Sequence, residues 1–163
     1  MTAVVEIPQG GNQKYEVDKA TGLLRLSRVL FSAFEYPFNY GFIPQTLALD
    51  DDPLDILVVG LPAESLSLLT ARPVGMLRML DEGETDDKIL AAPAHDPRYD
   101  EIEDLEDMAD HSLKELHHFF THYKELEEKE TLVTEWLDRE GACREIQASL
   151  DRYGTRFGDP GPG

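Results

Sequence analysis

Cysteine, long apolar runs and basic residues are all scarce in this sequence. The one cysteine, Cys143, excludes an internal disulfide and any cysteine-based zinc site. No run approaches the roughly 18 apolar residues that a membrane-spanning helix needs. The first residues lack the basic segment and the apolar core of a secretion signal. We therefore expect a cytoplasmic protein.

The shortage of basic residues gives the chain a strong negative charge. Fifteen Lys and Arg stand against 33 Asp and Glu, for a formal net charge of −18. A general nucleic-acid binder needs a basic surface to displace counterions, and docking on an anionic membrane needs one too. Both classes are disfavoured. The carboxylates either form a solvated surface or include ligands for divalent cations, and composition leaves both interpretations open.

The length of 163 residues and the balanced composition indicate one globular domain. We expect this domain to span residues 1–157. Residues 158–163 contain only Gly, Pro and Asp, so we expect a disordered tail there.

Short apolar segments separated by Gly and Pro fill the first 92 residues and predict the strands of a small barrel or sandwich. These segments are residues 4–7, 15–17, 23–26, 55–59, 66–71, 74–79 and 88–92. The last third is expected to be helical. One helix is predicted near a capping box formed by Ser112 and Glu115. A second is predicted to begin after Asp138 and to end at Gly154.

The densest candidate feature is Asp50-Asp51-Asp52-Pro53-Leu54-Asp55, which leads directly into an apolar strand. On an extended chain, Asp50 and Asp52 would point to the same side. Carboxylates this close repel one another unless a cation neutralises them, and Mg²⁺ prefers oxygen ligands. The alternative is an acidic turn between strands, because aspartate also suits turns.

A second acidic cluster, residues 81–87, separates two predicted strands and is followed by Lys88. Asp81 ends one strand and Asp86 precedes the next, so both could point the same way. A polar hairpin loop is the simpler interpretation when the cluster is taken alone.

Basic and phenolic residues form a third set. Lys14 and Glu16 alternate along a strand and so share one face. Three further features belong to this set: Arg28, an aromatic segment at residues 36–44, and the pair Tyr123-Lys124. Taken singly, each is more readily explained by a structural role than by a catalytic one. The histidines at 117, 118 and 122 lack the His-Glu-x-x-His pattern of a zinc helix, so we expect them on a helix surface.

Taken together and in order, these segments resemble the soluble family I inorganic pyrophosphatases. The family signature Asp-x-Asp-Pro-x-Asp corresponds to Asp50–Asp55. The other matching segments are Glu6-Ile7-Pro8, Lys14-Tyr15-Glu16, Arg28, Tyr36-Pro37, Tyr40-Gly41-Phe42-Ile43-Pro44, Arg72-Pro73-Val74-Gly75, Asp81 with Asp86 and Lys88, and His118-Phe119-Phe120 with Tyr123-Lys124. The resemblance implies an α+β, mainly β fold: a five-stranded, OB-like closed barrel with two α-helices in the C-terminal half.

The resemblance also implies a reaction and a set of roles. Pyrophosphate, bound as its Mg²⁺ complex, would be hydrolysed to two orthophosphates by metal-activated water, with in-line phosphoryl transfer. Several Mg²⁺ ions would act per site, with Mn²⁺ or Zn²⁺ as substitutes, and the chain would form a homohexamer. The implied metal ligands are Asp50, Asp55, Asp81, Asp86 and Glu16, with Glu6 a weaker candidate. The implied general base is Asp52, and the implied phosphate-binding residues are Lys14, Arg28, Tyr40, Lys88, Tyr123 and Lys124.

Two departures from the family pattern stand out. A Gly-Lys pair usually follows the Tyr-Lys motif, but residues 125–130 are mostly acidic here, which puts one phosphate contact in question. The Pro-Gly turn is missing from residues 60–65. Two other functions remain open: an inactive cation- or phosphate-binding relative, and a two-metal phosphohydrolase acting on nucleotides.

Overall fold

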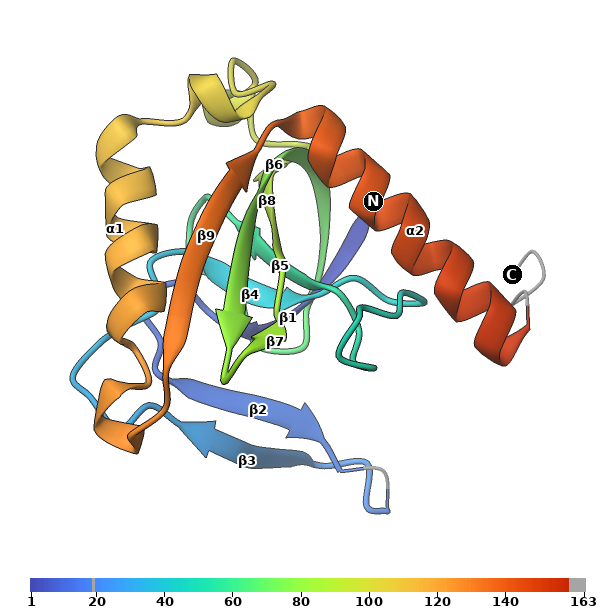
Figure 1. Ribbon diagram of the computed structural model, residues 1–163. Coiled ribbons are helices and arrows are strands. Elements are labelled where there is room, and N and C mark those ends of the chain that lie inside the picture. Colours follow the sequence, from blue (N-terminus) through green and yellow to red (C-terminus); the bar gives the residue numbers. More distant parts are fainter. Residues whose placement is uncertain (19, 159–163) are drawn as a thin grey trace.

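The computed structural model describes residues 1–18 and 20–158 (Figure 1). Its strands are β1 (Thr2–Ile7), β2 (Gln13–Val17), β3 (Leu24–Val29), β4 (Asn39–Phe42), β5 (Asp55–Val58), β6 (Leu68–Asp81), β7 (Glu84–Thr85), β8 (Lys88–Pro93) and β9 (Thr131–Leu137). The α-helices found in the described residues are α1 (Asp110–His122) and α2 (Arg139–Phe157). The fold is therefore mixed α+β and mainly β, with its two helices in the C-terminal half.

Five strands close a ring of hydrogen bonds. Strand β1 pairs with β4, β4 with β5, β5 with β8, β8 with β6, and β6 returns to β1. Only the β5–β8 pairing within this ring is parallel. That parallel register places Asp55 directly opposite Lys88. Strands β2 and β3 form a separate two-stranded sheet, seen below the ring in Figure 1.

Strand β6 is one long strand, although the sequence predicted two shorter ones at this place. It pairs with β1 near its start, with β8 along its middle and with β9 toward its end. Proline usually interrupts a strand, but the register between β6 and β8 shifts between Pro73 and Gly75. This irregularity accommodates the proline, so the strand continues through it.

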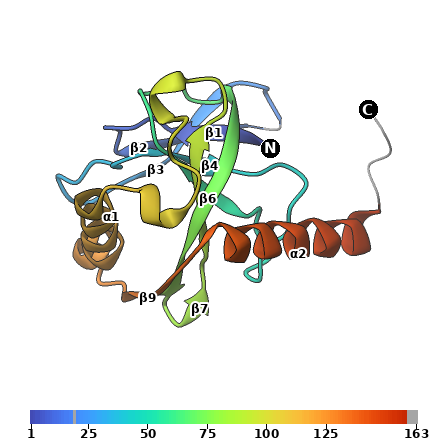
Figure 2. The ribbon, with the colours of Figure 1, turned by 90° about the horizontal axis from the view of Figure 1, so that it is seen from above.

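The two helices cover different parts of the sheet, and Figure 2 shows them on opposite sides of β6. Helix α1 buries Leu116 and Phe120 in the apolar cluster that also contains Leu77 and Met79 of β6. Helix α2 buries Ala142 in a second apolar cluster. Burial of apolar area at about 25 cal/mol per Å² drives both contacts.

Helix ends differ from the sequence-based expectations in two places. Helix α1 begins at Asp110, and its N-cap Ala109 makes no side-chain hydrogen bond, so the expected capping box at Ser112 is wrong. Helix α2 does begin after Asp138, whose side chain accepts a hydrogen bond from the Gly141 amide. It passes through Gly154 and ends at Phe157, because Gly158 adopts φ +83° and caps it.

Three strands were not predicted: β4, the two-residue β7 and β9. Residues 159–163 of the expected disordered tail lie outside the described residues. Across residues 1–18 and 20–158, no helix combines the length and the apolar character that crossing a membrane requires.

Candidate active site

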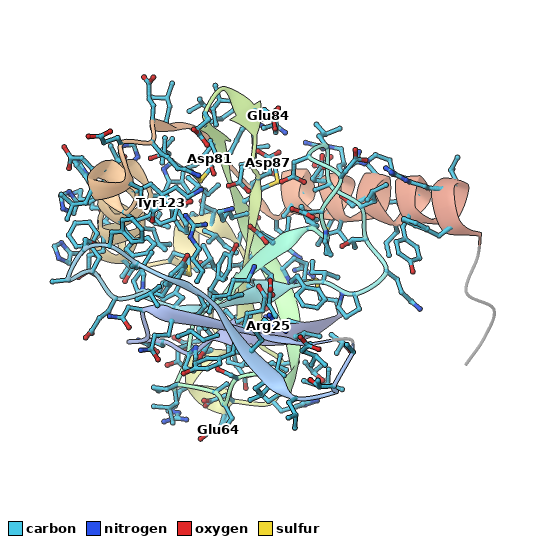
Figure 3. The ribbon with its side chains drawn as sticks, turned by 90° about the horizontal axis from the view of Figure 1, so that it is seen from below. Arg25, Glu64, Asp81, Glu84, Asp87 and Tyr123 are labelled. Carbon is cyan, nitrogen blue, oxygen red and sulfur yellow. The ribbon has the colours of Figure 1, made fainter. Side chains whose placement is uncertain are left out.

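A polar cavity of ≈ 630 Å³ gathers segments that lie far apart in the sequence. Every predicted site residue except Lys88 lines it. These lining residues are Glu6, Lys14, Glu16, Arg28, Tyr40, Asp50, Asp52, Asp55, Asp81, Asp86, Tyr123 and Lys124. In Figure 3, Asp81 and Tyr123 lie toward helix α1, whereas Asp87 lies on the side of α2.

The acidic loop before β5 is a turn, and the extended geometry expected for it is wrong. Asp51 adopts a left-handed φ of +70°. The Asp52 amide donates to Asp50 Oδ1 at 3.1 Å, and the Ala48 amide donates to the Asp52 carbonyl oxygen at 2.7 Å. Asp50 and Asp52 nevertheless both line the cavity, while the Asp51 carboxylate pairs with Arg156 of helix α2. Burial raises the pKa of Asp50 above its ordinary value.

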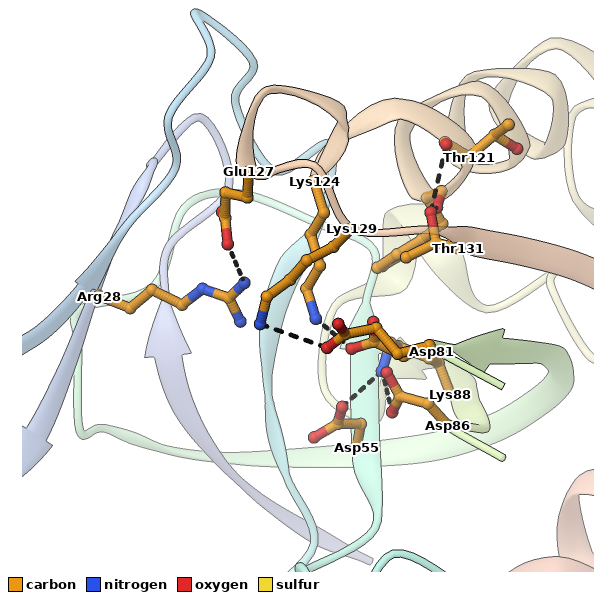
Figure 4. Close-up of polar contacts among 12 residues, drawn as sticks. Arg28, Asp55, Asp81, Asp86, Lys88, Thr121, Lys124, Glu127, Lys129 and Thr131 are labelled. Atoms are coloured by element: carbon orange, nitrogen blue, oxygen red, sulfur yellow. Dashed lines mark hydrogen bonds and ion pairs between the residues drawn. The ribbon is translucent and has the colours of Figure 1, made fainter. Parts of the chain in front are cut away.

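Lys88 lies beneath the cavity floor and is 1% exposed. Its Nζ donates to Asp55 Oδ2 and to Asp86 Oδ1, both at 2.6 Å (Figure 4). The Tyr40 hydroxyl also donates to Asp55 Oδ2 at 2.6 Å. Burial alone would lower the pKa of Lys88, but Asp55 and Asp86 outweigh it and hold that pKa well above the ordinary value. Lys88 is therefore a buried cation shared by two carboxylates.

The end of helix α1 supplies a second lysine–carboxylate pair. Lys124 follows the C-cap Tyr123, is 5% exposed and donates through Nζ to Asp81 Oδ2 (Figure 4). The other carboxylate oxygen, Asp81 Oδ1, is buried and has no hydrogen-bond partner among residues 1–18 and 20–158. Burial raises the pKa of Tyr123 above its ordinary value, so its hydroxyl stays protonated at neutral pH.

The β2–β3 sheet forms the opposite wall. Its register pairs Lys14 with Arg28, which brings both cations to the cavity. Lys14 Nζ lies 3.1 Å from Glu6 Oε2 and 3.4 Å from Glu16 Oε1. Burial raises the pKa of Glu6 to about 7, although Lys14 opposes this shift. Burial also lowers the pKa of Lys14, but Glu6 leaves it raised overall.

Arg28 is held by a residue that sequence reasoning missed. Its Nη2 donates to Glu127 Oε2 at 3.1 Å (Figure 4). Burial would lower the pKa of Arg28, and Glu127 more than compensates. Glu127 lies in a 3₁₀ turn within the acidic segment that follows Lys124. Its sequence neighbours are also acidic, so no pattern distinguished it.

Lys129 was also missed, although it is the one basic residue in the segment 125–130. Its Nζ lies 3.4 Å from Glu82 Oε2, and Glu82 lines the cavity. The left-handed Glu128, at φ +57°, turns the chain just before it. Lys129 therefore brings a cation to the rim near the place where the family pattern led us to expect a Gly-Lys pair. Other lining residues that we did not predict as site residues are Tyr36, Phe42, Pro53, Glu84 and Thr85.

The histidines lie away from the cavity. His118 and His122 contact each other with ring centroids 4.5 Å apart, and neither lines the cavity. In the described part of the chain, no three His, Cys, Asp or Glu side chains already stand together as an ion site. Asp55, Asp81 and Asp86 are instead paired with lysines.

The donor set of the cavity still fits Mg²⁺. The candidate ligands are carboxylate oxygens, which hard divalent cations prefer. Asp81 Oδ1, which is buried and lacks a partner within the described part of the chain, provides an acceptor at the site. An unsatisfied buried acceptor is unfavourable, and a cation would satisfy it. The residues present therefore fit the Mg²⁺ that the family resemblance implies.

Carboxylates for divalent cations, facing lysine, arginine and tyrosine groups for phosphate oxygens, are the arrangement expected of an enzyme that acts on phosphate compounds. Comparison with known proteins narrows this class. The family model described as "Inorganic pyrophosphatase" matches residues 3–154. The chain belongs to the inorganic pyrophosphatase family, and the resemblance seen in its sequence is confirmed.

Relatives from distant organisms support the same family. The soluble inorganic pyrophosphatase of Oryza sativa subsp. indica is 49% identical over 155 residues, which is 93% of this chain and 72% of the rice protein. The inorganic pyrophosphatase of Geobacillus stearothermophilus is 45% identical over 152 residues, covering 93% of this chain and 92% of that protein. The crystal structure of the Thermus thermophilus inorganic pyrophosphatase superposes with a TM-score of 0.89 at 42% identity, covering 94% of this chain and 90% of that one.

Proposed function

We propose that the cavity is the active site in which this chain hydrolyses inorganic pyrophosphate, the reaction of its family. The observation that carries the proposal is the composition of the cavity. Acidic ligands and the cationic groups Lys14, Arg28 and Lys124 line one space. Pyrophosphate is a small, highly charged anion, so its hydrolysis depends on positioning and on electrostatic stabilisation of the transferring phosphoryl group.

Family I pyrophosphatases depend on Mg²⁺, and four carboxylates are proposed to hold it here: Asp50, Asp55, Asp81 and Asp86. Glu16 and, more weakly, Glu6 are candidates for a further ion at the β2 wall. When bound, such ions neutralise phosphate charge and lower the pKa of a nearby water. Mn²⁺ or Zn²⁺ would have to fit the same oxygen ligands.

The cations and phenols of the chain are proposed to orient the substrate. Lys14 and Arg28 face the cavity from one wall, and Lys124 with Tyr123 face it from the end of α1. Tyr40 lines the cavity and is tied to Asp55. Lys88 lies below the floor, so we assign its effect to the charge and position of Asp55 and Asp86.

Asp52 is proposed as the general base that takes a proton from the attacking water. It lines the cavity, and its carboxylate takes part in none of the ion pairs found among residues 1–18 and 20–158. By contrast, Asp55, Asp81 and Asp86 are each held by a lysine. A carboxylate without a competing cation is free to accept a proton and to release it to solvent.

The remaining expectations extend this proposal. We propose that the hydrogen-bonded ring of five strands is the OB-like closed barrel of the family and that residues 1–157 form one domain. We also propose a cytoplasmic homohexamer that binds neither nucleic acid nor membrane. Light scattering at working concentration tests the assembly, and a mass of 18.4 kDa, that of one chain, would refute it.

Phosphate release tests the function directly. With Mg²⁺, the purified chain should release phosphate from pyrophosphate. Phosphate release should stop when the metal is chelated, and release from ATP should be far slower. Asp52→Asn is the matched control, because it keeps the fold and the proposed ligands. No release from pyrophosphate would indicate an inactive relative, and preferred release from ATP would indicate a nucleotide phosphohydrolase.

A further inference from the structure

The C-terminal half of helix α2 holds the loop that carries Asp50 and Asp52. Arg152 makes the central contact: its Nε donates to the Leu47 carbonyl oxygen at 2.7 Å. The Leu47 amide in turn donates to the Ser149 carbonyl oxygen at 3.0 Å. Both backbone groups of Leu47 are therefore bound to one turn of the helix. Figures 1 and 2 show this loop running beside α2.

The guanidinium of Arg152 is itself fixed from two sides. Its Nη2 donates to Glu145 Oε1 at 2.5 Å and to Ser149 Oγ at 2.7 Å. Ser149 is fully buried, and the Glu145 side chain is 16% exposed. A planar guanidinium can satisfy three acceptors in fixed directions, which a single ammonium group cannot do as well. The position of the Leu47 carbonyl is thus set by a rigid donor.

Leu47 is connected to the proposed base, Asp52, through the hydrogen bonds of its neighbour Ala48. The next amide, that of Ala48, donates to the Asp52 carbonyl oxygen at 2.7 Å, and the Asp51 amide donates back to the Ala48 carbonyl oxygen at 3.3 Å. These bonds close residues 48–52 into one turn. A shift of Leu47 therefore carries Asp50 and Asp52 with it.

The strand side of the loop is anchored independently. The hydroxyl of Thr46, which is 2% exposed, donates to the Ile43 carbonyl oxygen and accepts from the Leu54 amide at 2.9 Å. These contacts fix the base of the loop but do not touch residues 48–52. Among the described residues, the hydrogen bonds and ion pairs that reach residues 47–52 from another element come from helix α2: Ser149 and Arg152 bind Leu47, and Arg156 pairs with the exposed Asp51.

We infer that Arg152 is a positioning residue for the reaction, holding Asp50 and Asp52 at the cavity through Leu47. The inference rests on the proposed function, because it concerns the same site. It assigns to helix α2 a role that the sequence did not suggest, since Arg152 lies 105 residues beyond Leu47. The competing explanation is that Arg152 only fastens α2 to the rest of the protein.

The test compares Arg152→Met and Arg152→Lys with two controls on the same helix. Arg144→Gln removes an exposed arginine that pairs with Glu140. Ala142→Gly weakens α2 at a buried position about two helical turns before Ser149. For each variant, kcat and KM for pyrophosphate, the Mg²⁺ concentration for half-maximal activity and the melting temperature are measured. Mn²⁺ binding without substrate is measured by titration calorimetry.

We expect Arg152→Met to lower kcat about 10- to 100-fold, because small misplacements of catalytic groups have effects of this order. KM should change less, since Lys14, Arg28 and Lys124 come from other elements. Mn²⁺ binding should weaken because Asp50 is displaced. Arg152→Lys should recover part of both losses. Ala142→Gly should lower the melting temperature while kcat and Mn²⁺ affinity stay near those of the parent, and Arg144→Gln should change nothing.

Two results would overturn the inference. One is parent-like kcat and Mn²⁺ affinity in folded Arg152→Met. The other is an equal loss in Ala142→Gly at an equal drop in melting temperature, which would make Arg152 a structural anchor. The Mn²⁺ titration needs no turnover. It therefore decides the inference even if the parent proves inactive on pyrophosphate, a result that would count only against the proposed function.

Discussion

Replacing Lys88 by methionine should make the stability of the protein depend strongly on divalent cations. The amine of Lys88 is 2.6 Å from both Asp55 Oδ2 and Asp86 Oδ1, and the residue is 1% exposed. Methionine retains a long, flexible apolar side chain and removes the charge. The variant then has two carboxylates facing each other with no cation between them.

The magnitude follows from the burial of the partners. Removing one member of a buried ion pair typically costs about 3–5 kcal/mol. The side chains of Asp55 and Asp86 are 19% and 18% exposed, so water screens them in part and the lower end applies. A loss of about 3 kcal/mol corresponds to a fall in melting temperature of about 6–12 °C for a chain of this length.

Bound Mg²⁺ should reverse most of this loss, because the same two carboxylates are its proposed ligands. A ligand that binds only the folded state stabilises it by mass action. We therefore expect Mg²⁺ to raise the melting temperature of Lys88→Met more than that of the parent. The assay is thermal unfolding followed by circular dichroism, in EDTA and in saturating MgCl₂.

The matched control is Lys114→Met, which removes an exposed lysine from helix α1. An exposed substitution of this kind should change stability by no more than about 0.5 kcal/mol. The reasoning is refuted if Lys88→Met has the same melting temperature as the parent in EDTA. It is also refuted if Mg²⁺ raises both melting temperatures equally.

Four further predictions concern the acidic groups and the cation proposed to bind them. Asp52→Asn should lower kcat about 10²–10⁴-fold with little change in Mg²⁺ affinity. Asp55→Asn should instead weaken Mg²⁺ binding, so that its activity partly returns at high Mg²⁺. Initial rates measured against Mg²⁺ concentration test both, and rescue of Asp52→Asn but not of Asp55→Asn would mean that the two roles are reversed. In the same assay Asp51→Gly should be nearly silent, because its carboxylate is exposed and its φ of +70° suits glycine. In the metal-free protein, burial raises the pKa of Glu6 from 4.5 to about 7. Between these pH values the folded state binds a proton that the unfolded state has lost. The free energy of unfolding should therefore fall as the pH rises from 4.5 to about 7. Glu6→Gln should flatten that slope in urea unfolding, and an unchanged slope would contradict the assignment. Ca²⁺ should bind but support little turnover, because it takes more ligands at longer distances than Mg²⁺; phosphate release with Ca²⁺ alone at the Mg²⁺ rate would rule this out.

Much of the candidate site could be predicted because its residues form short motifs in a fixed order. Asp50, Asp52 and Asp55 lie in one motif, and the family resemblance linked that motif to Lys14 and Tyr123. The sequence could not predict which charges would pair. Asp55 and Lys88 are 33 residues apart, and only the parallel register of β5 and β8 places them opposite each other.

The fold was harder to predict where local propensity and tertiary packing disagree. Strand β4 is short, and it contains Gly41, which by propensity alone belongs in a turn. The structure requires glycine there, because a Cβ would lie 1.8 Å from the Val4 carbonyl oxygen of the neighbouring strand. Strand β9 does not alternate apolar and polar residues: its apolar residues come in the pairs Leu132-Val133 and Trp136-Leu137. Without a strand period, and lying between two helices, it was predicted as part of the helical third.

The lysine–carboxylate pairs explain how so acidic a cavity can fold before it binds a cation. Without Lys88 and Lys124, the carboxylates of Asp55, Asp81 and Asp86 would repel one another at partly buried positions. The two lysines differ in what they can do next. Lys124 lines the cavity, so we propose that it turns from Asp81 to a phosphate oxygen when a cation takes its place. Lys88 is enclosed between Asp55 and Asp86 below the floor, so it remains with them and limits the negative charge that bound cations must neutralise.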